Sequence, residues 1–350
     1  MVFLLVASAH AYETDQLTWR EHQLVDAAPI ANHAMDELLS IAVARANART
    51  GCRGTDEEVH SVVADEIHAV TSLPVRVWSR GVLRSPGFST YSAALERSDR
   101  VDRFAFTGRE DIYGGVSAWQ SVILATAGPC STFEIGGVRT GSDKLDHFLD
   151  TGYGYWRTAR RTTLEVAVER GTRTERSFYG LLTSKTFSYA DLRANWDGFR
   201  FYEGLLGPDS VVRRSDDGCL EIARPFDWRA WIDSEWDEVL NPPVYTHLVE
   251  EAVLRGLDAR RDEVCSARSR WDEGGWRERM LRALPSPPYV VGPAPARRDP
   301  WQLEALCDDA RTLPLEASAV RPHDEVRDQR RGPARPRGSE VPTEARRTVR

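Results

Sequence analysis

Apolar residues recur at helical spacing along most of the chain, and this period predicts a mainly α-helical protein. Residues 24–48 carry such a stripe, and we expect an interruption near Pro29 because proline lacks a backbone donor. The sequence from Thr55 to Glu58 has the Thr-x-x-Glu spacing of a capping box. It predicts a second helix that runs through about Val70.

The central part of the chain predicts two longer helices. The first is expected over residues 143–170, with Ser142 as its N-cap and Gly171 as its C-terminal stop. The second is expected over residues 189–206, with Ser188 as its N-cap. Further helices are predicted over residues 117–127, 245–258 and 271–284.

Two glycine-containing turns, each between short alternating segments, predict β-hairpins. Gly136 and Gly137 separate residues 132–135 from residues 138–140. A second turn ends at Gly218, between residues 211–214 and 219–223. The expected fold is therefore mainly α, an irregular helical bundle with two small β-hairpins and a disordered C-terminal tail.

The ends of the chain differ from its middle. Residues 1–11 form an apolar run that ends in Ala9-His10-Ala11, which is typical of a signal peptide cleaved before Tyr12. Residues 12–284 have the composition of a single helical domain. Residues 285–350 are rich in Pro and Arg with little to bury, and we expect most of this tail to be disordered. We expect a periplasmic or secreted protein with no transmembrane span in the mature chain.

Charge and cysteine content narrow the functional classes. The net charge of −7 argues against a general nucleic-acid binder, which would be basic. Export permits disulfides, and the odd count of 5 cysteines leaves at least one free or paired between chains. Only Lys144 and Lys185 are lysines in a chain whose other basic residues are arginines. Lysine at these two positions is informative because lysine and arginine side chains differ in size, hydration and donor geometry.

The first chemical motif is Asp143-Lys144-x-x-His147, followed by Asp150. Asp143 and His147 lie one helical turn apart and share a face, and Asp150 follows at the next turn. A carboxylate beside an imidazole suits acid–base chemistry or metal binding.

The second motif is Asp191-x-x-x-Asn195-x-x-Gly198. Asp191 and Asn195 share a helix face. A glycine inside a helix usually has a packing reason, so Gly198, Gly152 and Gly154 would let the two motif helices approach closely. We expect the polar faces of both motifs to meet in one shared pocket or network.

Together, Asp-Lys-x-x-His and the downstream Ala190-Asp-x-x-x-Asn-x-x-Gly resemble an uncharacterised family of exported proteobacterial proteins. The segments 12–16, 114–116 and 241–243 are similar to that family as well, and the likeness spans about residues 12–284. The first motif alone also resembles VanZ-like proteins. The resemblance implies an envelope location and no particular activity.

Three interpretations of the motifs stay open. In a hydrolase acting on cell-envelope material, His147 would be the general base or the partner of a nucleophile, and Asp143 would orient it. The other motif residues would bind or stabilise charge. These other candidate catalytic residues are Lys144, Asp191 and Asn195.

In a site for a divalent metal, the ligands would be His147 with Asp143 or Asp150, joined by His247 and Glu251. In the third interpretation, which we favour, the polar residues hold the helices together or bind an envelope component or small ligand without chemistry. No cofactor is otherwise expected, and whether the protein is an enzyme stays open.

Overall fold

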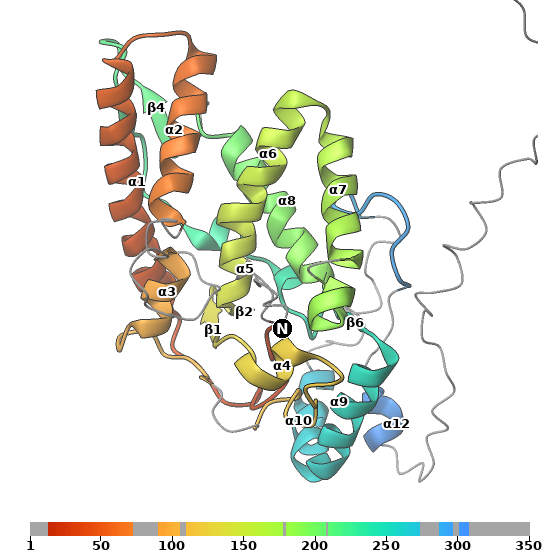
Figure 1. Ribbon diagram of the computed structural model, residues 1–350. Coiled ribbons are helices and arrows are strands. Elements are labelled where there is room, and N and C mark those ends of the chain that lie inside the picture. The colour runs from red at the N-terminus through yellow and green to blue at the C-terminus, as the bar shows by residue number, and fades with distance from the viewer. Residues whose placement is uncertain are drawn as a thin grey trace, which may run out of the picture.

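Helices dominate the computed structural model, as the apolar spacing predicts, and the mainly α fold class is confirmed (Figure 1). The structure describes residues 13–72, 90–105, 110–177, 180–207, 209–273, 287–296 and 301–307. The expected signal peptide and residues 308–350 lie outside these ranges. In the part that is described, no helix is long and apolar enough to cross a membrane.

The first two helices pack side by side at one end of the molecule (Figure 1). Helix α1 spans Ala28–Thr50 and α2 spans Asp56–Thr71. Pro29 lies in the first turn of α1, so it starts the helix rather than interrupting it. The capping box at Thr55 is confirmed, with both reciprocal hydrogen bonds present.

The single helix expected over residues 143–170 is wrong. The segment folds as α5 (Ser142–Asp146), a π-helical turn η2 (His147–Thr151), α6 (Gly152–Arg161) and α7 (Leu164–Arg176). The break comes at Thr163, whose side chain caps α7 by accepting a hydrogen bond from the Val166 backbone.

Two smaller expectations for this segment are also wrong. Gly171 does not stop the helix but lies within α7, where a side chain would overlap the ring of Tyr155. The N-cap of α5 is Gly141, with no side-chain cap, and Ser142 instead donates to Glu96 Oε1 at 2.6 Å.

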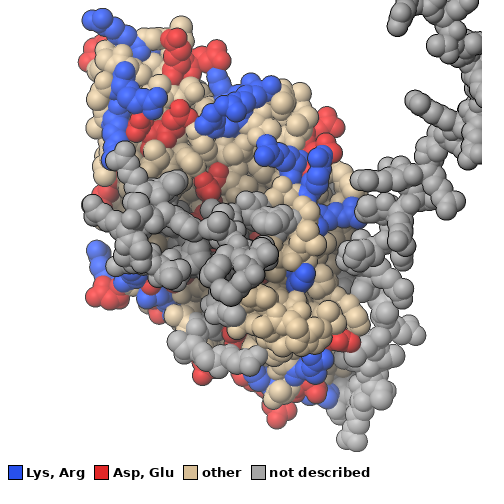
Figure 2. Space-filling model, viewed as in Figure 1, with Lys and Arg blue, Asp and Glu red and all other residues tan. Residues whose placement is uncertain are grey.

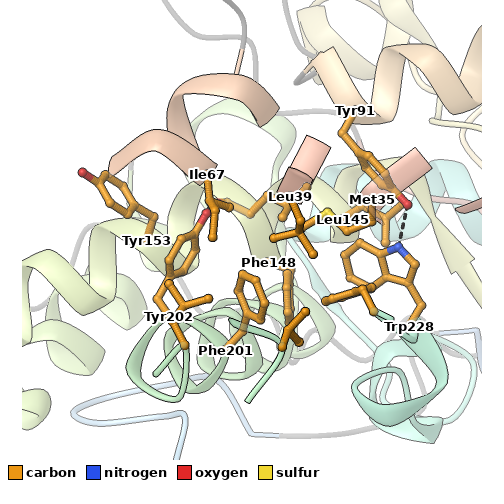
Figure 3. Packing of buried hydrophobic residues seen from close by; sticks show 14 of the residues in the cluster. Met35, Leu39, Ile67, Tyr91, Leu145, Phe148, Tyr153, Phe201, Tyr202 and Trp228 are labelled. Carbon is orange, nitrogen blue, oxygen red and sulfur yellow. Dashed lines mark hydrogen bonds between the residues drawn. The ribbon is translucent and has the colours of Figure 1, made fainter. Parts of the chain in front are cut away.

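Helix α8 (Tyr189–Glu203) follows α7 and is capped by Ser188, as expected. It packs against α6 and η2, and the apolar side of these elements lies in the main core (Figure 3). In that core Phe148 from η2 lies among side chains from α1, α8 and the 228–236 segment. The packing stripe of the first motif is thus buried opposite its polar face.

In the part of the chain that the structure describes, there are three two-stranded antiparallel sheets. The expected hairpins are β1 (Thr132–Ile135) with β2 (Val138–Gly141), and β4 (Val212–Arg214) with β5 (Leu220–Ile222). The third sheet joins β3 (Thr186–Phe187) to β6 (Val244–Tyr245). It was not predicted because its two-residue strands lie far apart in the chain and have no local turn signal.

The remaining α-helices of the described ranges lie mostly at the other end of the molecule (Figure 1). They are α3 (Thr90–Arg97), α4 (Val122–Ala127), α9 (His247–Ala259), α10 (Arg261–Glu273) and α12 (Leu303–Cys307). The helix expected over 117–127 begins only at Val122, after a turn. Residues 274–286 lie outside the described ranges, so the helix expected over 271–284 is not tested beyond Glu273.

The packed body reaches beyond residue 284, where we expected the domain to end. Tyr289, Trp301 and Leu303 are fully or almost fully buried. A disulfide between Cys265 and Cys307 fastens α12 to α10. Aromatic residues widely spaced in a Pro-rich segment carry no helical or strand period, which is why the sequence did not place them in the core.

A second disulfide, Cys52–Cys219, ties the end of α1 to the β4–β5 turn across 167 residues. Cys130 is buried and forms no disulfide.

We predict that reduction of both disulfides with dithiothreitol lowers the free energy of unfolding by about 2–5 kcal/mol, because long closed loops restrict the unfolded chain most. Thermal unfolding with and without reductant measures this. A variant with serine at all four bonded cysteines should show no response to reductant; an equal response in both would contradict the prediction.

Candidate functional site

The two sequence motifs meet in the folded protein. The polar side of α5 and η2 faces the first two turns of α8, so Lys144 Nζ lies 2.7 Å from Asp191 Oδ1. One turn further along, His147 Nδ1 lies 2.9 Å from Asn195 Oδ1. All five candidate residues of the two motifs are buried in this contact: Asp143, Lys144, His147, Asp191 and Asn195.

Lys144 lies at the centre of the contact and is 0% exposed. Its Nζ is 2.7 Å from Asp143 Oδ2, 2.7 Å from Asp191 Oδ1 and 2.9 Å from Glu238 Oε1. The ammonium group donates a hydrogen bond to Asp143 and forms ion pairs with the carboxylates of Asp191 and Glu238. Burial alone would lower the pKa of Lys144, but the surrounding carboxylates raise it well above its usual value, so the ammonium stays charged.

His147 is held from both sides of its ring. Nε2 lies 3.1 Å from Asp191 Oδ2, and Nδ1 faces the Asn195 oxygen. Both partners accept, so the arrangement suits a doubly protonated imidazolium. Burial by itself would lower the pKa of His147, but the charge and hydrogen bond of Asp191 raise it to about 10. Desolvation opposes ionisation of Asp191, yet the two cations beside it hold its pKa well below the usual value.

Three buried glutamates that we did not nominate belong to the same network. Glu238 contacts Lys144, and Glu175 accepts a hydrogen bond from the Ser188 backbone at 3.0 Å. Glu13 interacts electrostatically with both of these glutamates and with Lys144. Burial raises the pKa of Glu238 to about 7 and that of Glu175 to about 8, and raises the pKa of Glu13 well above its usual value. With Asp143 and Asp191, the network holds five carboxyl groups around the two cations Lys144 and His147. Proton uptake by the three glutamates reduces this excess of negative charge.

Ser188 joins the cap of α8 to the network. Its Oγ accepts from the Asp191 backbone at 3.1 Å and donates to Glu238 Oε1 at 2.9 Å. The capping residue found from sequence therefore also orients one of the carboxylates that the sequence did not reveal. Glu238 follows a Trp- and acid-rich segment with no regular period, so no local signal distinguishes it.

The chain segment from Glu13 to Gln16 runs through the interior beside the network. Its four polar residues are at most 4% exposed. Thr14 Oγ1 donates to Asp143 Oδ1, and Gln16 Nε2 donates to the Arg139 carbonyl at 3.0 Å. Glu13 Oε2 has no hydrogen-bond partner among the described residues. The sequence signals were a run of four polar residues shortly after the apolar N-terminal stretch and the family resemblance of segment 12–16.

The two helices approach closely at glycines, as the sequence predicts. A β-carbon on Gly152 would lie 2.5 Å from the Gly198 Cα, and one on Gly198 would overlap the Phe148 carbonyl group. Glycines at both positions thus permit the backbones to come near enough for Lys144 and His147 to reach α8. For Gly154 the expectation of close approach is wrong, because no atom lies within 4 Å of where its β-carbon would be.

The other candidate metal ligands lie elsewhere. Asp150 Oδ1 accepts from His68 Nε2 of α2 at 2.6 Å, and His247 pairs with Glu251 on α9 at 3.2 Å. Across the described ranges, no group of three or more His, Cys, Asp or Glu side chains is arranged to hold a metal ion. The Lys144 ammonium occupies the position among the carboxylates that a cation would take. Metal binding by His147 with Asp143 stays an untested prediction.

Comparisons with family models, with curated proteins and with solved structures give no match. Neither a family nor an activity follows from them.

Proposed function

We propose that this chain is an exported protein of the cell envelope that acts by binding or scaffolding, with the Lys144 network as the polar core of its fold. One observation carries this proposal: Lys144 is fully buried, and its Nζ lies within 2.9 Å of carboxylates from three parts of the chain. Such a network fixes how α5, α8 and the 238 region meet. The two disulfides are compatible with an oxidising compartment outside the cytoplasm.

The protonation of His147 argues against the general-base role. A general base works best when its pKa lies near the working pH. With a pKa of about 10, the His147 imidazole carries its proton at neutral pH and has no free nitrogen to accept another. Its two ring nitrogens are also engaged by Asp191 and Asn195.

A hydrolase of envelope material is the second candidate, and the buried glutamates favour it. The pKa of Glu238 is about 7 and that of Glu175 about 8, within the range of useful proton donors and acceptors near neutral pH. In such an enzyme a glutamate would replace His147 as the base, with Lys144 and His147 stabilising negative charge.

The test is His147→Ala, assayed for stability and for envelope phenotype in a deletion strain. Removing one partner of a buried charge pair should lower the free energy of unfolding by about 3–5 kcal/mol. His247→Ala is the matched control: this histidine also faces a carboxylate, but its side chain is 40% exposed, and we expect a change of about 1 kcal/mol or less. Loss of phenotype with an unchanged melting temperature for His147→Ala would overturn the structural role.

The raised pKa of His147 predicts that this residue stabilises the protein less as the pH rises. Its folded pKa of about 10 lies above the usual 6.5, so its stabilisation is complete below about pH 6.5 and is lost as the pH rises through 10. The raised pKa values of Glu175 and Glu238 act in the same direction. We predict that the gap in urea-unfolding free energy between wild type and His147→Gln narrows from pH 6 to pH 10. A gap that widens over this range would show that His147 is neutral in the folded state.

A further inference from the structure

Four large apolar side chains are exposed around α4, and none of them belongs to the Lys144 network. The exposed fractions are 73% for Trp119, 62% for Val122, 60% for Leu182 and 40% for Leu248. We call these four residues the α4 face. Leu182 comes from the π-helical turn η3 (Gly180–Ser184), and Leu248 from the first turn of α9. Three separate segments therefore contribute to one surface.

Hydrogen bonds beneath the α4 face hold the three segments together. Gln120 Nε2 donates to the Leu248 carbonyl at 2.7 Å, and Ser121 Oγ donates to the Thr183 carbonyl at 3.2 Å. Gln120 Oε1 also accepts from the backbone and hydroxyl of Ser117, at 2.9 and 2.7 Å. Trp119 is thus displayed on a turn that is fixed at both ends, so little ordering entropy would be lost when it contacts a partner.

The surroundings of the α4 face carry little charge. Figure 2 shows an area over α4 that lacks coloured side chains, with Lys, Arg, Asp and Glu at its margin. Lys185 lies next to η3, where its Nζ donates to the Leu182 carbonyl at 2.9 Å. It is one of only two lysines in the chain.

The size of the α4 face favours one kind of partner. An aromatic side chain buries about 150–250 Å² when fully covered, so these four partly exposed side chains offer only a few hundred Å². A stable protein dimer needs about 800 Å² from each partner. Shallow insertion into a membrane interface needs only a few apolar side chains, and tryptophan and lysine are the residue types that suit its depth.

We propose that the α4 face docks this protein on a lipid bilayer, with Trp119, Val122 and Leu182 entering the headgroup region and Lys185 beside lipid phosphates. The peripheral contact is independent of the Lys144 network, so either proposal can fail without the other.

Vesicle co-sedimentation of the full chain tests this proposal. The vesicles are phosphatidylcholine with or without phosphatidylglycerol, and the test variant is Trp119→Ser/Val122→Ser/Leu182→Ser. The matched control is Val25→Ser/Ile41→Ser/Val166→Ser, which removes three other exposed apolar side chains. We expect the test variant to partition at least tenfold more weakly than wild type, and the control to stay within twofold. Anionic lipid should strengthen binding, and Lys185→Gln should reduce that gain.

Three results would overturn the proposal. One is a failure of wild type to bind either vesicle, and another is equal partitioning of wild type and the test variant, which would assign binding to another segment. The third is self-association of wild type in sedimentation velocity that the triple substitution abolishes while vesicle binding persists. If the triple variant does not fold, Trp119→Ser alone decides: it should lower partitioning at least threefold and reduce fluorescence quenching by brominated lipid.

Discussion

Lys144→Met is expected to destabilise the protein by about 3–5 kcal/mol, which is the usual cost of leaving a buried charge without its partner. Methionine fills a similar volume, but Asp143, Asp191 and Glu238 would then face one another without the ammonium between them. We expect a fall in melting temperature of roughly 10 °C, measured by circular dichroism or calorimetry. Among the described residues, Lys144 is the cation paired with three buried carboxylates.

Lys185→Met is the matched control, since the chain has only these two lysines. Lys185 Nζ contacts a backbone carbonyl at the surface, so its replacement should change stability by about 0.5 kcal/mol or less. The difference in free energy of unfolding between wild type and Lys144→Met should also shrink as the pH falls from 8 to 5, because carboxylates that repel one another take up protons. Equal stability of the two variants at pH 7 would show that the Lys144 network does not hold the fold.

Gly198→Ala should cost about 3 kcal/mol, because the added β-carbon overlaps the backbone carbonyl of Phe148 and a backbone cannot move aside cheaply. The helices α8 and η2 would have to separate, which lengthens the contacts from Lys144 and His147 to Asp191. We expect loss of stability, measured by urea unfolding, together with a lower pKa of His147, measured by nuclear magnetic resonance. The second change follows because Asp191 is what raises that pKa.

Gly154→Ala provides the control on the same helix as Gly152. No atom lies within 4 Å of the place where its β-carbon would be, and alanine favours helix by about 1 kcal/mol over glycine. This variant should be as stable as wild type or more stable. A similar loss for Gly154→Ala and Gly198→Ala would mean that glycine matters here for flexibility rather than for close approach.

Several helix caps and one turn could be predicted from the local sequence pattern alone. The capping box at Thr55, the cap at Ser188 and the turn at Gly136 and Gly137 are each made by residues a few positions apart, so their chemistry is visible in the sequence. The break at Thr163 was missed because threonine also occurs inside helices. Only its extended backbone, which lets the hydroxyl cap α7, makes it a boundary.

The pairing of the two motifs could also be predicted, because polar residues at helical spacing beside small residues indicate two helices in close contact. The polar faces of Asp143-Lys144-x-x-His147 and Asp191-x-x-x-Asn195 do meet. A hydrogen-bonded core and a catalytic centre use the same residue types, and the stability and phenotype of His147→Ala distinguish the two.

By itself the sequence determined the helices α1, α2, α8 and α9, two hairpins and the two faces that meet, because each depends on neighbours in the chain. Tertiary structure alone decided the composition of the network. Glu13, Glu175 and Glu238 come from three distant segments, and each lies beside the cations only after those segments pack. The charge state of His147 was likewise decided there, because a pKa depends on burial and on nearby charges, which the order of residues does not contain.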